Sequence, residues 1–215
     1  VCSSDLFSYA KKNNVPIVYW SKEDPPHYES FVDYAKKSDY IFTTAMECVE
    51  KYRKDTGNHN VYVLKYGINP LIHNPLGSRI RDLKNFKTKN SALFAGTWYP
   101  HHADRIVDQY RIFDGIISSS MDLLILDRNF FSNILNYDYP SKYHLNTYPS
   151  IEYQKLQKIH KLFDWAVNFN IVKESQTMCA ARVYELQALG VSIISNESLA
   201  IQNMFPNIFV PKSTE

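Results

Sequence analysis

The chain has 215 residues and a mass of 25.1 kDa, enough for one large domain or two small ones. Hydrophobic residues make up 45% of it and charged residues 21%, which is typical of a globular protein and excludes a wholly disordered or fibrous chain. Because the 24 basic residues nearly balance the 22 acidic ones, the sequence does not indicate a dedicated nucleic-acid-binding protein.

The sequence gives no signal for a membrane span, a disulfide framework or a metal site. No stretch reaches the roughly 20 apolar residues that a membrane span requires, and no secretory signal is recognisable at the front. Cys2, Cys48 and Cys179 lie far apart, without the C-x-x-C spacing that would indicate zinc. We therefore expect a cytoplasmic protein with no metal and no integral membrane segment.

The first part of the chain alternates between helical and strand patterns. Apolar residues at helical spacing predict helices, and short apolar runs rich in β-branched and aromatic residues predict strands. In chain order these are helix 6–12, strand 15–20, helix 29–37, strand 40–44, helix 45–54 and strand 61–68. Such continuously apolar strands are typical of a parallel sheet covered on both faces, so residues 1–76 are predicted to form a partial N-terminal Rossmann-like domain.

The periodicity disappears over residues 77–90, which contain five basic residues and one acidic residue. We interpret this segment as a linker between domains. A solvated charged loop is the simplest meaning of its charge, and contact with phosphate or a membrane surface is the alternative.

The alternation resumes in residues 91–215. Strands are predicted at 92–95, 123–126, 166–171, 191–195 and 208–210, and helices at 103–113, 152–163 and 177–189. This pattern predicts a C-terminal Rossmann-like domain. The expected fold class is therefore α/β, with two parallel sheets facing across a cleft, where such proteins bind ligands.

Two pairs of residues lie where this second sheet would bind a ligand. The usual phosphate motifs G-x-G-x-x-G and G-x-x-x-x-G-K-[ST] are missing. However, Gly96 and Thr97 follow the first predicted strand of the domain, and Asp127 and Arg128 follow the second. Because α/β sheets bind ligands at the carboxyl ends of their strands, all four are candidates. For the glycine, a simple strand-to-helix turn is the alternative.

A further candidate anion site lies near the predicted start of a helix. Ser175, Thr177 and Met178 are expected to begin that helix, where unpaired N–H groups attract anions. Arg182 and Glu185 are three residues apart on one face, so the arginine can reach phosphate while the glutamate accepts from ribose hydroxyls. A surface ion pair between these two side chains is the alternative.

The loop after the strand 15–20 concentrates titratable groups. Glu23, Asp24 and His27 lie within it, at the carboxyl edge of the first sheet. Such a loop can supply a general base or hold substrate hydroxyls. A charged, solvated turn is the alternative interpretation.

Several segments, in the right order, carry a resemblance to a known family over about residues 15–200. They are 16–25, 39–44, 61–64, 69–75, 94–99, 177–178 and 182–186. On these segments the chain resembles the bacterial CgeB-like glycosyltransferases, named for a spore maturation protein, and the wider group 1 glycosyl transferases of GT-B architecture. The resemblance implies two Rossmann-like domains, with a nucleotide-sugar donor on the second and an acceptor on the first.

The resemblance also implies an activity, the transfer of a hexose-type sugar from a nucleotide-diphosphate-sugar to a cell-surface or spore-type glycan or glycoconjugate. In related enzymes a helix start and a basic residue receive the diphosphate and a glutamate receives the ribose. Here that points to Thr177, Arg182 and Glu185, with Gly96 and Thr97 facing the donor. Because N–H groups and arginine stabilise the leaving diphosphate, neither a metal nor a cofactor is expected.

The stereochemistry of the reaction stays open at this stage. An inverting enzyme needs a base near the acceptor, and Asp24, Glu23 and His27 are the candidates. Many retaining group 1 enzymes have a second glutamate eight residues before the ribose glutamate, where this sequence has Thr177.

Other functions and partners are also considered. The same fold could be a non-catalytic nucleotide- or sugar-binding module or a sugar-nucleotide epimerase, whereas RNA binding is opposed by the balanced charge. A first domain of about 76 residues buries only a thin core. Additional chain segments or a homo-oligomer are therefore expected to complete it.

Overall fold

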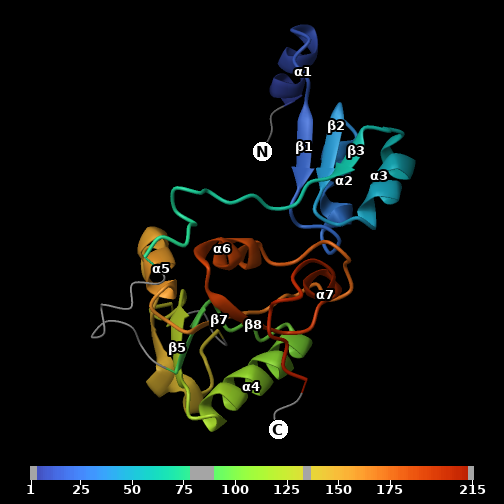
Figure 1. Cartoon of the computed structure of the whole chain (residues 1–215). Coiled ribbons are helices and arrows are strands. Elements are labelled where there is room, and N and C mark those ends of the chain that lie inside the picture. The colour runs from blue at the N-terminus through green and yellow to red at the C-terminus, as the bar shows by residue number, and fades with distance from the viewer. Residues whose placement is uncertain (1–3, 78–89, 133–136, 213–215) are drawn as a thin grey trace. The chain divides into compact units, whose positions relative to one another are not determined.

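The structure, a computed structural model, describes residues 4–77, 90–132 and 137–212. By their contacts these residues form two compact units, each described separately here (Figure 1). Unit 1 lies within Val1–Tyr66, Val172–Cys179 and Ser198–Met204, and unit 2 within Gly67–Ile171, Ala180–Glu197 and Phe205–Glu215. The predicted linker, residues 77–90, lies almost entirely outside the described residues.

Unit 1 is built on a three-stranded parallel sheet (Figure 1). Side by side and in chain order, its strands are β1 (Val18–Ser21), β2 (Tyr40–Thr43) and β3 (Val61–Val63). Its helices are α1 (Ser4–Lys12), α2 (Tyr28–Ala35), α3 (Cys48–Thr56) and, from late in the chain, α7 (Leu199–Met204). The predicted order of helices and strands is confirmed. β3 ends at Val63 rather than at residue 68, because its neighbour β2 ends at Thr43.

The core of unit 1 joins the two connecting helices to the sheet. Val32 of α2 and both Cys48 and Tyr52 of α3 pack in one buried cluster with Ile41 of the central strand. α3 ends where Gly57 takes a left-handed φ of 70°, a conformation that favours glycine. The apolar spacing that predicts these helices therefore also determines the face that each buries.

Unit 2 is built on a five-stranded parallel sheet in the order β6-β5-β4-β7-β8. Its strands are β4 (Ser91–Ala95), β5 (Asp122–Asp127), β6 (Thr147–Pro149), β7 (Trp165–Asn168) and β8 (Ser192–Ser195). Its helices are α4 (Ala103–Ser118), the 3-10 helix η1 (Ser141–Asn146), α5 (Tyr153–His160) and α6 (Ala181–Leu189). The central strand β4 is buried along its whole length.

Helices cover both faces of this second sheet. Neighbouring residues of β4 point to opposite sides: Phe94 packs with Phe113 of α4, whereas Leu93 belongs to a cluster with Leu156 and Ile159 of α5. With two parallel sheets, each interleaved with helices, the predicted α/β fold class is confirmed. None of the described helices is long and apolar enough to cross a membrane.

Three local predictions in unit 2 need correction. The strand predicted at 208–210 is a single bridge between Phe209 and Ile194, because Pro211 has no N–H with which to extend the pairing. β6 was not predicted, since three residues ending in a proline are too few for a strand pattern. The helix predicted from residue 177 begins at Ala181, for a reason given below.

Candidate functional site

Three segments of unit 2 meet at the carboxyl edge of the five-stranded sheet. Residues 96–97 follow β4, residues 127–128 follow β5, and α6, which comes after β7, has Arg182 and Glu185 near its start. β4 lies between β5 and β7, and all three run parallel, so these residues come from adjacent strand ends. The structure thus brings together the predicted site residues that belong to this unit.

The turn after β4 has no room for a side chain at residue 96. A Cβ atom on Gly96 would lie 2.5 Å from the ring of Phe94, which is fully buried in the core. The backbone of Gly96 is fixed at both ends, since its N–H donates to the Leu126 carbonyl (3.0 Å) and its carbonyl accepts from the Tyr139 hydroxyl (3.1 Å). Packing therefore requires a glycine here, independently of any ligand.

Arg105, which the sequence analysis did not identify, lies in the first turn of α4 beside this turn. Its side chain is nearly buried, its guanidinium stacks 4.8 Å from the Tyr99 ring, and one terminal nitrogen donates to the Thr97 carbonyl over 3.4 Å. Its Nε has no hydrogen-bond partner among the described residues. Burial leaves the charge of this guanidinium poorly solvated and thereby lowers its pKa.

Arg182 is still less well satisfied. Its guanidinium lies 5.8 Å from the Phe94 ring, and no described residue forms a hydrogen bond or an ion pair with it. Burial lowers its pKa; the charge of Glu185 opposes this shift, and the charges of Arg105 and Arg128 add to it. A cation in such surroundings gains stability when an anion binds.

Three guanidinium groups, those of Arg105, Arg128 and Arg182, therefore share one edge of the sheet and repel one another. Arginine presents its N–H groups as a planar fork that matches the oxygen atoms of a phosphate or carboxylate. An arrangement of this kind is suited to a ligand that carries more than one negative charge.

Glu185 lies on the same helix but does not neutralise the arginines. Its side chain is 23% exposed, and its Oε1 accepts a hydrogen bond of 2.6 Å from the Tyr153 hydroxyl. No ion pair joins it to Arg182 within the described part of the chain, so the surface pair considered above does not form. Its second oxygen remains available to a ligand hydroxyl.

Asp127 borders a neighbouring cavity of about 320 Å³, lined also by Phe130, Asp138, Tyr139, His144 and Thr147. The carboxyl group is nearly buried and accepts from the Asn129 N–H over 3.0 Å. Burial raises its pKa, and the Asn129 bond partly offsets this. Among the described residues no group of three histidine, cysteine or acidic side chains could hold a metal ion.

The start of α6, and with it Arg182, is held by a buried network of asparagines. Asn170 accepts from the Ala180 N–H through Oδ1 (2.9 Å) and donates its own backbone N–H to Asn196 Oδ1 (2.7 Å). Asn196 in turn donates to Asp108 Oδ2 over 2.8 Å. Since buried polar networks specify a single geometry when satisfied, this one fixes where α6 begins.

Ser175, Thr177 and Met178 belong to unit 1 and do not begin α6. The Thr177 hydroxyl bridges a carbonyl (2.8 Å) and an N–H (2.9 Å) of the loop after β2. The Ser175 hydroxyl accepts from the Met178 N–H over 3.0 Å, and the Met178 side chain packs on the core of unit 1. The predicted helix start at these residues is wrong because their polar groups already bind the backbone of unit 1.

The predicted catalytic residues lie in the loop between β1 and α2. Asp24 is fully buried, and its carboxylate accepts from the hydroxyls of Thr43 (2.6 Å) and Tyr52 (3.1 Å). Glu23 and His27 are exposed. A general base must reach the proton that it removes. Asp24 is therefore placed as a structural anchor of the loop, whereas Glu23 and His27 are accessible.

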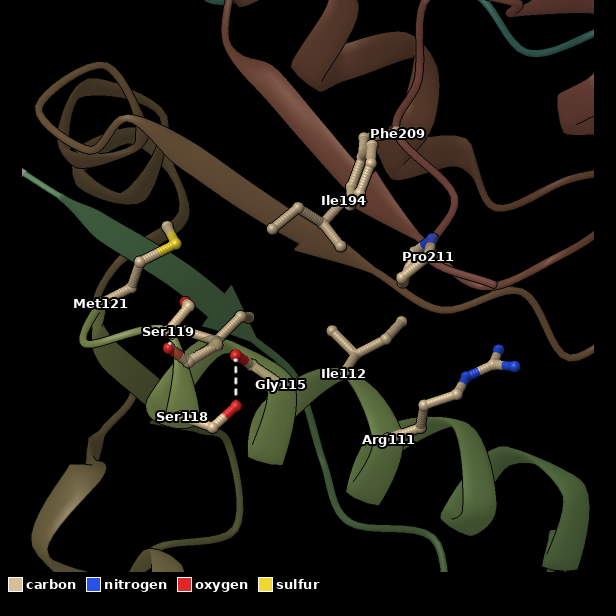
Figure 2. A pocket seen from close by; sticks show the side chains of 10 residues that line it. Arg111, Ile112, Gly115, Ser118, Ser119, Met121, Ile194, Phe209 and Pro211 are labelled. Atoms are coloured by element: carbon tan, nitrogen blue, oxygen red, sulfur yellow. Dashed lines mark hydrogen bonds between the residues drawn. The ribbon is translucent and has the colours of Figure 1, made fainter. Parts of the chain in front are cut away.

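A second cavity, of about 310 Å³, lies at the opposite end of unit 2 (Figure 2). It runs beside the last turns of α4, where the Ser118 hydroxyl donates to the Gly115 carbonyl over 3.0 Å, and Phe209 lies across from that helix. Met121, which lines it, immediately precedes β5. This mainly apolar cavity is therefore at the amino edge of the sheet, remote from the three arginines.

Comparison with known proteins shows a shared fold. No family model and no curated protein matches the sequence. The structure is similar to HepE of Anabaena, solved with UDP and glucose (TM-score 0.60, 12% identity, 97% of this chain and 61% of that one). It is also similar to a glycosyltransferase of Rickettsia africae (TM-score 0.55, 12% identity, 98% and 66%). The fold is thus of the GT-B type, and the chain spans less than two thirds of the length of either protein.

Proposed function

We propose that the carboxyl edge of unit 2 binds a nucleotide-diphosphate-sugar and that the chain acts as a glycosyltransferase. The observation that carries this proposal is the cluster of Arg105, Arg128 and Arg182, which repel one another beside the partly exposed Glu185. A nucleoside diphosphate supplies anionic oxygens for the guanidinium groups and ribose hydroxyls for the carboxylate. The similarity to HepE, solved with UDP and glucose, supports this choice of ligand.

In this proposal the arginines act on the leaving group. When the bond between the sugar carbon and the diphosphate oxygen breaks, negative charge grows on the diphosphate. Arg182 and Arg105 stabilise that charge at low cost, because the fold already holds them in place and no described side chain forms an ion pair with either. Charge neutralisation by these residues makes a divalent metal unnecessary, so we propose a metal-independent transfer.

The acceptor side is proposed to lie in unit 1. If the reaction inverts, the base that takes the acceptor proton is chosen from the exposed Glu23 and His27, because Asp24 is enclosed. The CgeB-like segments favour a hydroxyl of a glycan or glycoconjugate as acceptor. A cytoplasmic location, where nucleotide-sugars are made, fits the same proposal.

The direct test is turnover. The chain is incubated with UDP-, GDP-, CDP- and dTDP-sugars in a chelator, with and without hydroxyl acceptors, and released nucleoside diphosphate is measured. We expect one donor to be consumed, faster with an acceptor, and the activity to be lost in Arg182→Ala. Isomerised donor without acceptor would instead indicate an epimerase, and binding without release a non-catalytic module. No binding of any donor would overturn the proposal.

A further inference from the structure

Two side chains that were not predicted as site residues, Tyr153 and His73, lie next to Glu185. We propose that these two form a hydrogen-bonded relay that positions Glu185 and thereby makes the site prefer ribose to deoxyribose. The inference rests on the proposed function, because it assigns Glu185 to the ribose of a nucleotide. Tyr153 and His73 would be positioning residues, without contact to the ligand themselves.

The relay begins in the segment 69–75, which the family resemblance singles out and to which no role has so far been assigned. His73 is held there from both sides: its backbone N–H donates to the Asn69 carbonyl (2.7 Å), and the Asn69 N–H donates to its ring Nδ1 (3.1 Å). Its side chain is only 5% exposed. The imidazole is therefore fixed in position and orientation.

The direction of each proton in the relay follows from this anchor. A backbone N–H can only donate, so Nδ1 accepts, and the neutral ring carries its proton on Nε2. Nε2 lies 2.8 Å from the Tyr153 hydroxyl and donates to it. The tyrosine then donates its own proton to Glu185 Oε1, over 2.6 Å. The two rings meet edge to face, with their centroids 5.9 Å apart.

The relay leaves Glu185 with one oxygen bound and one oxygen for the ligand. Burial and the bond to Glu185 raise the pKa of Tyr153, so its hydroxyl keeps the proton that it donates. A hydrogen bond to a carboxylate is among the stronger ones in proteins. It also holds Glu185 away from an ion pair with Arg182, three residues before it, which would use up the charge that the diphosphate needs.

The test compares ribose preference in matched variants. Dissociation constants of UDP and 2′-deoxy-UDP, and of GDP and 2′-deoxy-GDP, are measured by calorimetry for the wild type and Tyr153→Phe. We expect the wild type to prefer ribose, and Tyr153→Phe to lose about tenfold in affinity for the ribonucleotide but little for the deoxynucleotide. His73→Phe should shift the ratio in the same direction. Tyr148→Phe, a change at an exposed tyrosine of β6, is the control and should keep the wild-type ratio.

Each other outcome rejects a defined step. A purely structural role for Tyr153 would lower affinity for both nucleotides equally, and thermal melting reports any loss of fold. If the wild type prefers ribose and Tyr153→Phe does so to the same degree, the relay is wrong while the proposed function stands. If the wild type binds a nucleotide without ribose preference, Glu185 does not read the ribose and the relay fails. If it binds no nucleotide, the proposed function fails and the inference with it.

Discussion

Asp24 in unit 1 and Arg182 in unit 2 are both charged side chains largely withdrawn from water, and they differ in what surrounds them. The Asp24 carboxylate receives hydrogen bonds from two hydroxyls of its own unit. No described residue forms a hydrogen bond or an ion pair with the Arg182 guanidinium, which lies near two more arginines. Burial alone therefore does not identify a functional charge. A buried charge that the protein satisfies stabilises the fold, whereas one that it leaves unsatisfied is available to a ligand.

The largest effect on stability should come from Asp24. Replacing Asp24 with alanine removes the buried carboxylate that accepts from the hydroxyls of Thr43 and Tyr52, so the free energy of unfolding should fall by about 3 kcal/mol. Chemical denaturation measures it. The matched control is Glu23→Ala, at the exposed neighbouring carboxylate, which should change stability by less than about 0.5 kcal/mol. Equal effects would show that Asp24 is not the anchor described here.

Arg182 should behave in the opposite way. Arg182→Met should weaken nucleoside diphosphate binding about 100-fold, since charge-assisted bonds to phosphate are lost. Yet it should raise the free energy of unfolding by about 1 kcal/mol, because an unsatisfied cation and its repulsion from Arg105 and Arg128 disappear. Arg53→Met is the control, since Arg53 pairs with Glu50 in unit 1 at 2.5 Å; it should leave nucleotide affinity unchanged and should not raise the free energy of unfolding. A destabilised Arg182→Met protein would contradict the contrast with Asp24.

His160 is a third buried titratable group and differs from Asp24 and Arg182 because it is buried in its neutral form. Burial lowers its pKa to about 3, and the charge of Arg182 adds to this. Below about pH 6.5 the unfolded chain binds a proton that the folded chain does not. The free energy of unfolding therefore decreases as the pH is lowered, by about 2 kcal/mol between pH 7 and pH 5 from this residue. Between pH 7 and pH 5 the free energy of unfolding of His160→Leu should therefore decrease by about 2 kcal/mol less than that of the wild type. His101→Leu, a change at an exposed histidine, is the matched control for replacing a histidine with leucine.

The smallest expected change in stability comes from alanine substitutions of two glycines, one near each edge of the sheet in unit 2. A Cβ atom at Gly115 meets nothing within 4 Å, so Gly115→Ala should stabilise α4 by about 1 kcal/mol and leave nucleotide affinity unchanged. At Gly96 the same change places the Cβ atom 2.5 Å from the Phe94 ring and should cost about 2 kcal/mol. The melting temperature should therefore rise in Gly115→Ala and fall in Gly96→Ala. A loss of nucleotide affinity in Gly115→Ala would argue against a site at the carboxyl edge.

The arrangement of strands and helices could be predicted because it depends on local patterns. Apolar runs such as 92–95 and 123–126 appear in the structure within a residue or two of their predicted bounds, as β4 and β5. The patterns fail where long-range contacts decide. Thr177 looks like a helix start in sequence, but it bonds to the backbone after β2, and α6 begins at Ala181.

The candidate site was only partly visible in the sequence for the same reason. A strand end predicts where Arg128 lies, since parallel strands share an edge. Arg182 was predicted from a helix start at residues 175–178, whereas the helix that carries it begins at Ala181. Arg105 was missed because it comes eight residues after Thr97, on a helix whose orientation about its own axis only the fold determines. A usable signal was nevertheless present, namely an arginine in the first turn of the helix that follows the loop after β4. Tyr153 and His73 are 80 residues apart, and no spacing rule connects them.

The central claim is that unsatisfied arginines at the carboxyl edge of unit 2 bind a nucleoside diphosphate. The most direct measurement is a calorimetric titration of the chain with UDP, GDP, CDP and dTDP in a chelator, repeated with Arg182→Met. We expect one nucleotide to bind without metal, and its affinity to drop about 100-fold in the variant while the melting temperature stays the same or rises. Unchanged affinity in Arg182→Met, or no binding by the wild type, would contradict it.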